Sequence, residues 1–252
     1  MNKKAKEILI VVVILILQTV LYVVAGTQKV YIHMDEAYSL GLASYDKTEI
    51  QANDDFYDNW HTKEYYEDYL VVNEDERGNY KPVYENQKND VHPPLYYLLL
   101  RIAMGFNIGH YSKWPGIVVN LIIHLFITIF MYLILQKLLK GHEKVKEKSI
   151  LLAFISSMTI ASLSTVLYIR MYSLATLNIV ITTFLHMKLY ESEKINIKLL
   201  ISIGIAALVG VLTHYYYVFF LGMLYIIFAI KYIKQKQYKQ LISYTVTMCI
   251  AA

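Results

Sequence analysis

The sequence has a single cysteine, Cys249, among its 252 residues. One cysteine excludes a disulfide within the chain and a zinc site built from cysteines, and it says little about the redox compartment. Charged residues are scarce as well, because Asp, Glu, Lys and Arg make up 17% of the chain whereas hydrophobic residues make up 56%. The apolar residues stand in long blocks instead of recurring singly at a helical or strand period, so the expected solvent is the lipid bilayer.

The sequence also lacks internal repeats and low-complexity tracts, and the middles of its apolar blocks carry almost no charge. A multi-spanning transporter or lipid flippase, the main alternative from another functional class, is expected to have charged or helix-breaking residues at mid-span and often repeat symmetry. Both absences count against that alternative. Only 10 residues are glycine, and with the many lysines and isoleucines this composition indicates a bacterial source with an AT-rich genome.

The apolar blocks predict an all-α, polytopic membrane protein with about seven transmembrane helices. The blocks are Ile8–Gly26, Pro115–Leu135, Ile150–Ile169, Leu174–Leu189, Leu199–Leu212, Tyr216–Ile230 and a last one that begins near Leu241. The first block follows three lysines but lacks a small-x-small cleavage site, which favours a retained helix over a signal peptide. Because the last block is still running at Ala252, we expect residues 1–252 to be a single transmembrane domain, truncated on its C-terminal side.

The distribution of lysine and arginine predicts the topology. The connections "QKLLKGHEKVKEKS", "KLYESEKINIK" and "KYIKQKQYKQ" are rich in lysine, whereas the turns around Arg170 and His214 carry almost no basic charge. The lysine-rich connections are therefore expected in the cytoplasm, together with the amino terminus, and the turns around Arg170 and His214 are expected outside. The protein is then a multi-pass protein of the bacterial plasma membrane, with the polar stretch 27–91 on its outer face.

Residues 92–106 form an apolar run that is too short for an ordinary span. If this run crossed the membrane, every later lysine-rich connection would lie outside. We therefore expect an interfacial or re-entrant helix with both ends outside, within a first outer loop at 27–114 that contains short interfacial helices.

The polar residues that stand out all fall on the predicted outer face. Asp35 and Glu36 follow the first block and are read either as a cap or solvated pair at a helix start, or as carboxylates that accept a proton from a hydroxyl or hold a divalent metal ion. His92 precedes two prolines, which suit the first turn of a helix, and Asn89 or Asp90 would help to cap it. Such a helix start is a plausible anion site, whereas the alternative is a simple turn into the membrane.

Two further outer turns carry candidate residues. Arg170 is suited to bidentate binding of phosphate, with snorkelling to lipid headgroups as the alternative. His214 precedes three tyrosines, which are also typical of an aromatic belt. Together the outer face would hold carboxylates, an anion-binding helix start, an arginine and aromatic rings. The predicted substrate-binding residues are Tyr96, Tyr172, His214 and Tyr215, whose aromatic faces suit a sugar ring.

Five stretches in this order resemble the C-superfamily of membrane glycosyltransferases: "HMDEAYSLGLAS", "HPPLYYLLLRI", "SKWPGIVVNLI", "RMYSLATLN" and "THYYYVFFLG". The nearest group is glycosyltransferase family 39 with its bacterial relatives, which include protein O-mannosyltransferases and aminoarabinose transferases. The resemblance runs from about residue 8 to residue 230. It implies transfer of a sugar from a polyprenyl-phosphate-linked donor to an acceptor hydroxyl on the outer face, generally with inversion at the anomeric carbon.

The resemblance also implies roles for particular residues. Asp35 would be the catalytic base, with Glu36 beside it, and His92 and Arg170 would bind the donor phosphate. Lys113 stands where an arginine is more usual. A divalent cation, Mg²⁺ or Mn²⁺, is left open, with Asp35 and Glu36 as its only visible ligands.

The implied partners are the polyprenyl-phosphate sugar, membrane lipids and an acceptor glycan, lipid or protein, with no nucleic acid. A sensor or assembly scaffold whose acidic outer loop binds a partner is a third hypothesis. It would leave His92 and Arg170 without a role.

Overall fold

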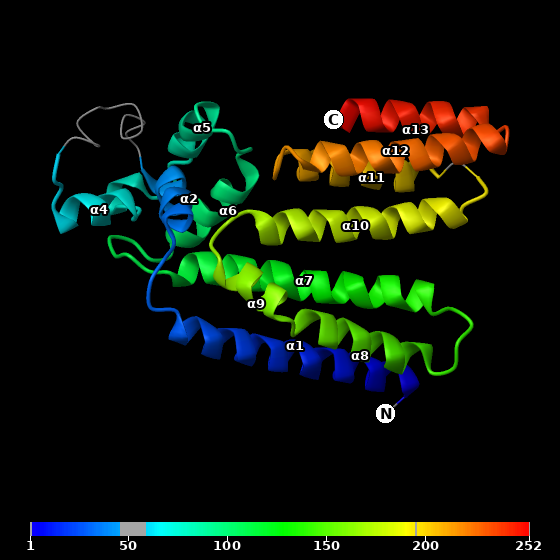
Figure 1. Ribbon diagram of the computed structural model, residues 1–252, viewed down its shortest axis with the longest axis horizontal. Helices are drawn as coiled ribbons and strands as arrows, with labels where there is room; N and C mark the ends of the chain where they lie inside the picture. The colour runs from blue at the N-terminus through cyan, green and yellow to red at the C-terminus, as the bar shows by residue number, and fades with distance from the viewer. Residues whose placement is uncertain (1, 46–58, 195, 252) are drawn as a thin grey trace.

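The computed structural model describes residues 2–45, 59–194 and 196–251, and the regular secondary structure of these ranges is entirely helical (Figure 1). The all-α prediction is confirmed for the described ranges. Residues 46–58 of the predicted outer loop and Ala252, the predicted point of truncation, lie outside them.

The first helix of the described chain and those from residue 114 onward run alongside one another and form a bundle (Figure 1). They are α1 (Lys3–Gln28), α7 (Trp114–Leu138), α8 (Val145–Ser157), α9 (Ile160–Leu167), α10 (Tyr172–Glu191), α11 (Ile197–Val211), α12 (Tyr217–Lys234) and α13 (Tyr238–Ala251). Helix α7 packs on α1, α8 and α10, and the series continues from α10 through α11 to α13. Many apolar side chains of these helices, such as Ile16 and Ile201, remain exposed on the outside of the bundle, as expected for a surface that faces lipid.

Three helices of the described chain are long and apolar enough to cross a membrane: α1, α7 and α12. The pair α8–α9 would be a fourth span if it is counted as one bent segment. By length and apolar content, the described chain therefore has three or four candidate spans, fewer than the predicted seven. Helix α11, for example, is apolar but has only 15 residues, whereas a span normally needs about 20.

The predicted span Ile150–Ile169 is divided into two helices, α8 and α9, which meet at an angle of 57°. Thr159 begins α9 by accepting a hydrogen bond from the Ser162 N–H at 3.2 Å. The carbonyl of Ser157, released at the break, accepts a hydrogen bond from the Tyr22 hydroxyl of α1. Polar side chains thus form hydrogen bonds to the backbone groups that the break releases. A broken helix within a membrane requires such partners.

The short helices of the described chain between residues 34 and 104 form a lobe at the end of the bundle away from the amino terminus, and we call them the end lobe (Figure 1). They are α2 (Met34–Ser44), α4 (Lys63–Tyr69), α5 (Lys81–Lys88) and α6 (Leu95–Met104), with the 3-10 helix η2 (Glu74–Glu76) between α4 and α5. Helix α6 packs against α2, α5 and α7. Its ten residues extend about 15 Å, half the thickness of a bilayer core.

The core of the end lobe continues into the bundle. Leu40 of α2, Val83 of α5 and Leu100 of α6 belong to the same buried cluster as Ile117 of α7. Helix α4 lies directly on α2 because Gly41 has no side chain, and a Cβ atom there would come to 1.8 Å from Cζ of Tyr69. This continuity holds α2 against the end of the bundle and so positions the residues at its start.

Candidate functional site

The start of α2 is fixed by a reciprocal pair of hydrogen bonds. The ring nitrogen Nδ1 of His33 accepts from the Asp35 N–H at 3.1 Å, and the carboxylate of Glu36 accepts from the His33 N–H at 2.7 Å. This capping box satisfies backbone donors that the first turn of a helix leaves free. It also sets the rotation of α2, so that Asp35 is partly exposed whereas Glu36 is turned inward.

Asp35 faces the connection between α9 and α10. The Tyr168 hydroxyl donates a hydrogen bond of 2.7 Å to Oδ2 of Asp35, whose side chain is 45% exposed. This hydrogen bond, aided by the nearby Arg170, lowers the pKa of the Asp35 carboxyl against the opposing effect of burial. Asp35 is therefore ionised at neutral pH. Burial and the Asp35 carboxylate raise the pKa of Tyr168 to about 12, so the phenol remains a donor.

Glu36 is only 1% exposed and both of its carboxylate oxygens are engaged. Oε2 pairs with Nζ of Lys29 at 2.8 Å, and Oε1 accepts from the Ile169 N–H at 2.8 Å. The geometry gives Glu36 a structural part, tying α2 to the segment that carries Arg170. In the described part of the chain, no group of three or more His, Cys, Asp or Glu side chains is arranged to hold a metal ion.

His92 lies in front of α6 and not within its first turn. Pro94 is the N-cap residue of α6, and the Leu95 N–H donates to the Leu212 carbonyl at 3.1 Å. The prediction of prolines in the first turn is therefore wrong, because Pro94 disfavours the helical conformation at the residue before it. The predicted capping by Asn89 or Asp90 is also wrong: Asn89 ends α5, and Asp90 pairs with Nδ1 of His92 at 2.9 Å.

Arg170 stands at the centre of the site and is only 8% exposed. Its Nη1 donates to the Asp35 carbonyl and to Oγ of Ser39, both at 3.3 Å, and its Nη2 lies 3.4 Å from Nε2 of His92. When Nδ1–H of His92 donates a hydrogen bond to Asp90, the lone pair of Nε2 faces the guanidinium. The Nε of Arg170 is buried without a hydrogen-bond partner. The structure thus brings Asp35, His92 and Arg170 together from three separate parts of the chain.

Aromatic rings border this cluster. Tyr172 stacks on Tyr168 with ring centroids 6.2 Å apart, and His214 lies 6.1 Å from Tyr172 and 6.3 Å from His92. Burial, His92 and Arg170 lower the pKa of His214, which favours its neutral form. The ring that stacks on His214 is that of Tyr216, at 5.3 Å, whereas the predicted Tyr215 is 55% exposed.

Tyr96, a predicted substrate-binding residue, faces the core and not the cluster. Its side chain is fully buried, and its hydroxyl donates to Oδ1 of Asn120 at 3.2 Å. The next residue, Tyr97, is the one that faces the site. Its buried hydroxyl has no hydrogen-bond partner and lies in the electrostatic field of Arg170 and Asp90. Successive residues point about 100° apart on a helix, so only one of the two tyrosines can face the cluster.

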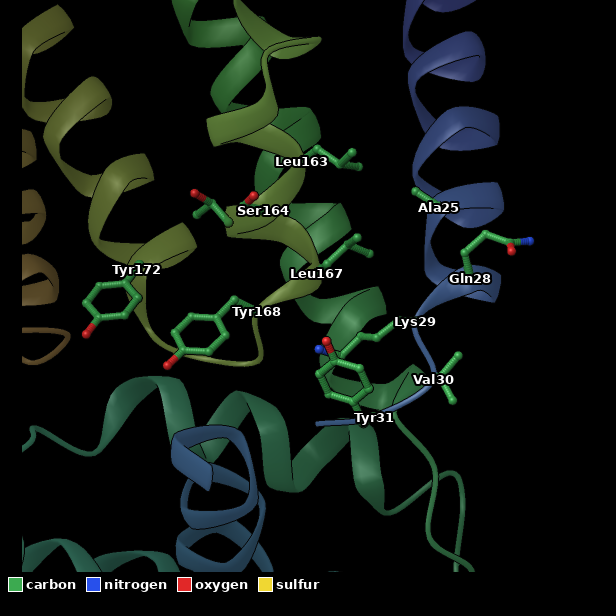
Figure 2. A pocket seen from close by; sticks show the side chains of 11 residues that line it. Ala25, Gln28, Lys29, Val30, Tyr31, Leu163, Ser164, Leu167, Tyr168 and Tyr172 are labelled. Atoms are coloured by element: carbon green, nitrogen blue, oxygen red, sulfur yellow. The ribbon is translucent and has the colours of Figure 1, made fainter. Parts of the chain in front are cut away.

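A groove of about 800 Å³ opens beside the cluster, between the end of α1 and the segment from α9 to α10. Figure 2 shows Tyr168 and Tyr172 side by side on one wall, with Lys29 and Tyr31 on the other. Apolar side chains such as Leu163 and Leu167 extend the groove along α9 (Figure 2). The cluster of charged groups therefore adjoins a mostly apolar groove between two helices of the bundle.

Several contributors to the candidate site are absent from the sequence-based expectations: His33, Ser39, Tyr97, Tyr168 and Tyr216. Only His33 has a local hint in the sequence, because it stands three residues before Glu36, the spacing of a capping box, although serine or threonine is the usual residue there. Comparisons of the chain with family models, with curated proteins and with solved structures find no match.

Proposed function

We propose that the protein is a membrane glycosyltransferase that moves a sugar from a polyprenyl-phosphate-linked donor to an acceptor hydroxyl. The observation that carries this proposal is the convergence of Asp35, His92 and Arg170 beside an apolar groove. A carboxylate, a phosphate-binding cation and a channel for a lipid are the three elements that such a reaction needs in one place.

The proposed roles follow from the charge of each group. Asp35, ionised at neutral pH, takes the proton of the acceptor hydroxyl as its oxygen attacks the anomeric carbon. The bond between that carbon and the phosphate oxygen breaks, and the electron pair leaves with the lipid phosphate. Arg170 stabilises the phosphate as its charge grows, and a buried guanidinium with an unpaired Nε is suited to this.

The surrounding groups complete the proposed site. His92 orients Arg170, because its ring nitrogen Nε2 lies 3.4 Å from Nη2 of the guanidinium. The groove between α1 and α9 accommodates the polyprenyl chain, and the exposed ring of Tyr172 offers a stacking face to the sugar. Glu36 acts as a positioning residue and not, as expected from the sequence, in catalysis, because its oxygens hold Lys29 and Ile169.

We further propose that the bundle spans the bacterial plasma membrane and that the end lobe lies outside. The lysine-rich connections α7–α8, α10–α11 and α12–α13 lie at the same end of the bundle as the amino terminus (Figure 1). The positive-inside rule assigns this end to the cytoplasm. The remaining helices of the bundle, α10, α11 and α13, run beside the candidate spans and raise the proposed number of crossings to seven.

Cysteine labelling tests this orientation. In a Cys249→Ser background, a cysteine in place of the exposed His110 is expected to react with a membrane-impermeant maleimide in intact cells. A cysteine in place of the exposed His142, in the α7–α8 connection, is expected to react only after the cells are opened. Labelling of position 142 but not 110 in intact cells would overturn the orientation.

Deletion of the gene in its host tests the activity. We expect mass spectrometry of the envelope glycans, lipids and proteins to show the loss of one sugar modification, and the intact gene to restore it.

A gene that carries Arg170→Gln is expected to restore little of this modification, since loss of one charge-stabilising donor typically lowers turnover by about 10²–10³-fold. The matched control is Arg77→Gln, because Arg77 is exposed on the end lobe and pairs only weakly with Glu74, at 3.9 Å. Full restoration by Arg170→Gln, or an unchanged envelope in the deletion strain, would contradict the proposal.

A further inference from the structure

The segment Tyr168–Met171, between α9 and α10, is held from both sides by buried polar side chains. On the α7 side, Nδ2 of Asn120 donates to the carbonyls of Val166 at 3.2 Å and Tyr168 at 2.8 Å. On the α2 side, Glu36 accepts the Ile169 N–H. Asn120 is fully buried and Glu36 nearly so, which makes these hydrogen bonds costly to break.

Close packing fixes the same segment further. Ile169 is fully buried against Gly116 of α7, where a Cβ atom would come to 2.4 Å from the Ile169 side chain. The backbone at Tyr168 is therefore held by hydrogen bonds and by contact with α7. The Tyr168 ring, in turn, lies between two others: it stacks on Tyr172 with an interplanar angle of 4° and meets the edge of His33 at 5.8 Å.

These contacts hold the phenol of Tyr168 in a defined position, where it has one strong hydrogen-bond partner. Its hydroxyl lies 2.7 Å from Oδ2 of Asp35 and 3.3 Å from Nδ1 of His33. Since His33 Nδ1 already accepts the Asp35 N–H, the phenol proton is best directed to the carboxylate. Of the two Asp35 oxygens, Oδ2 is occupied by Tyr168, and Oδ1 is the one left for an incoming group.

We propose that Tyr168 is a positioning residue for the proposed glycosyl transfer, holding Oδ2 of Asp35 so that Oδ1 receives the proton of the acceptor hydroxyl. The inference rests on the proposed function and extends it to a residue outside the predicted site. Asn120 and Glu36 serve it indirectly, because they brace the backbone from which Tyr168 and Arg170 extend.

The groups around Asp35 determine what removal of the phenol does. His33 lies on the same turn of α2, His92 precedes α6, and Tyr168 and Arg170 come from the α9–α10 connection. Each lowers the pKa of the Asp35 carboxyl, and the hydrogen bond from Tyr168 has the largest effect. Tyr168→Phe removes that hydrogen bond but keeps the ring and its stacking on Tyr172, so the Asp35 pKa is expected to rise.

The first test is the pH profile of transfer by purified full-length protein in liposomes, measured as release of polyprenyl phosphate. A base must be ionised to act, so activity is lost as the pH falls through the pKa of Asp35. In Tyr168→Phe we expect this acid limb to move to higher pH and the plateau to fall by about tenfold, because the carboxylate is less well oriented. Tyr84→Phe is the control, since Tyr84 is exposed on α5. An active Tyr168→Phe with an unchanged acid limb would overturn the inference.

The second test does not depend on activity. Infrared difference spectra recorded against pH contain the C=O band of the protonated Asp35 carboxyl, which is identified by its disappearance in Asp35→Asn. The band is expected to persist to higher pH in Tyr168→Phe than in the wild type, and identical titrations would refute the role of Tyr168 even if Tyr168→Phe is inactive. If the band persists to higher pH in Tyr168→Phe but the wild-type protein transfers no sugar, the proposed function is wrong although the hydrogen bond between Tyr168 and Asp35 is confirmed. Tyr168 would then position Asp35 for something other than sugar transfer.

Discussion

Replacing Asp35 by asparagine is expected to lower sugar transfer by about 10²–10⁴-fold, the usual contribution of a positioned general base. The amide has nearly the shape of the carboxylate, and its oxygen still accepts the hydrogen bond from Tyr168. It carries no charge and does not take up a proton at neutral pH. The variant therefore removes the proposed chemistry of Asp35 with little change in its surroundings.

The fold is expected to survive this substitution. Asp35 is partly exposed and contributes its backbone N–H, not its side chain, to the cap of α2. The loss of one negative charge in the first turn of a helix costs about 0.3–1 kcal/mol. Thermal unfolding in detergent and the yield of membrane-inserted protein should thus match the wild type.

Asp75→Asn is the matched control for Asp35→Asn. Asp75 is also an acidic residue in the first turn of a helix of the end lobe, but it is exposed. We expect this variant to transfer sugar at the wild-type rate. Wild-type turnover by Asp35→Asn, measured in the same liposomes, would remove Asp35 from the proposed role.

Replacing Arg101 by methionine is expected to have the largest effect on stability, lowering the free energy of unfolding of the end lobe by about 3–5 kcal/mol. Arg101 is 2% exposed, and its guanidinium donates to the carbonyls of Ala43 and Ser44 at the end of α2 and to that of Glu76 in η2. The last carbonyls of a helix have no partner within it, and a cation there also meets the negative end of the helix dipole. Methionine fills much of the space but leaves these buried acceptors without a donor.

Limited proteolysis of the end lobe in bicelles measures this effect. Arg101→Met is expected to be cut faster at sites in α4 and α5, whereas Arg77→Met, an exposed arginine of the same lobe, should be cut at the wild-type rate. Arg101→Lys should restore only part of the protection, because an ammonium cannot match the fork of a guanidinium that reaches three carbonyls. Equal protection in Arg101→Met and the wild type would show that other groups satisfy the end of α2.

The two variants separate chemistry from folding. Asp35→Asn should lose transfer and keep its stability. Arg101→Met should lose stability first and transfer only as a consequence, because α2 carries Asp35 at its other end. A transfer defect in Arg101→Met that recovers at low temperature, with no such recovery in Asp35→Asn, is the expected pattern.

Much of the helical framework follows from local features of the sequence. Each predicted apolar block corresponds to a helix or a helix pair, and the short run after His92 gives the ten-residue helix α6. Block length and apolar content are properties of contiguous residues, so they can be read without knowing the fold. The break between α8 and α9 was not predicted, because the serines and threonines of this apolar block do not reveal that Tyr22 satisfies the released carbonyl.

The sequence by itself determined which stretches to examine for a site, and the structure brings these together: the start of α2, the residues before α6, and the connections at Arg170 and His214. Only the tertiary structure decided which side chain of each stretch faces it. Asp35 faces the site and Glu36 the core, Tyr97 and not Tyr96 lies beside the cluster, and the ring that stacks on His214 is that of Tyr216. Neighbouring residues on a helix point about 100° apart, and the rotation of each helix is set by distant contacts, such as Glu36 with Ile169 and Leu95 with Leu212, that no local pattern contains.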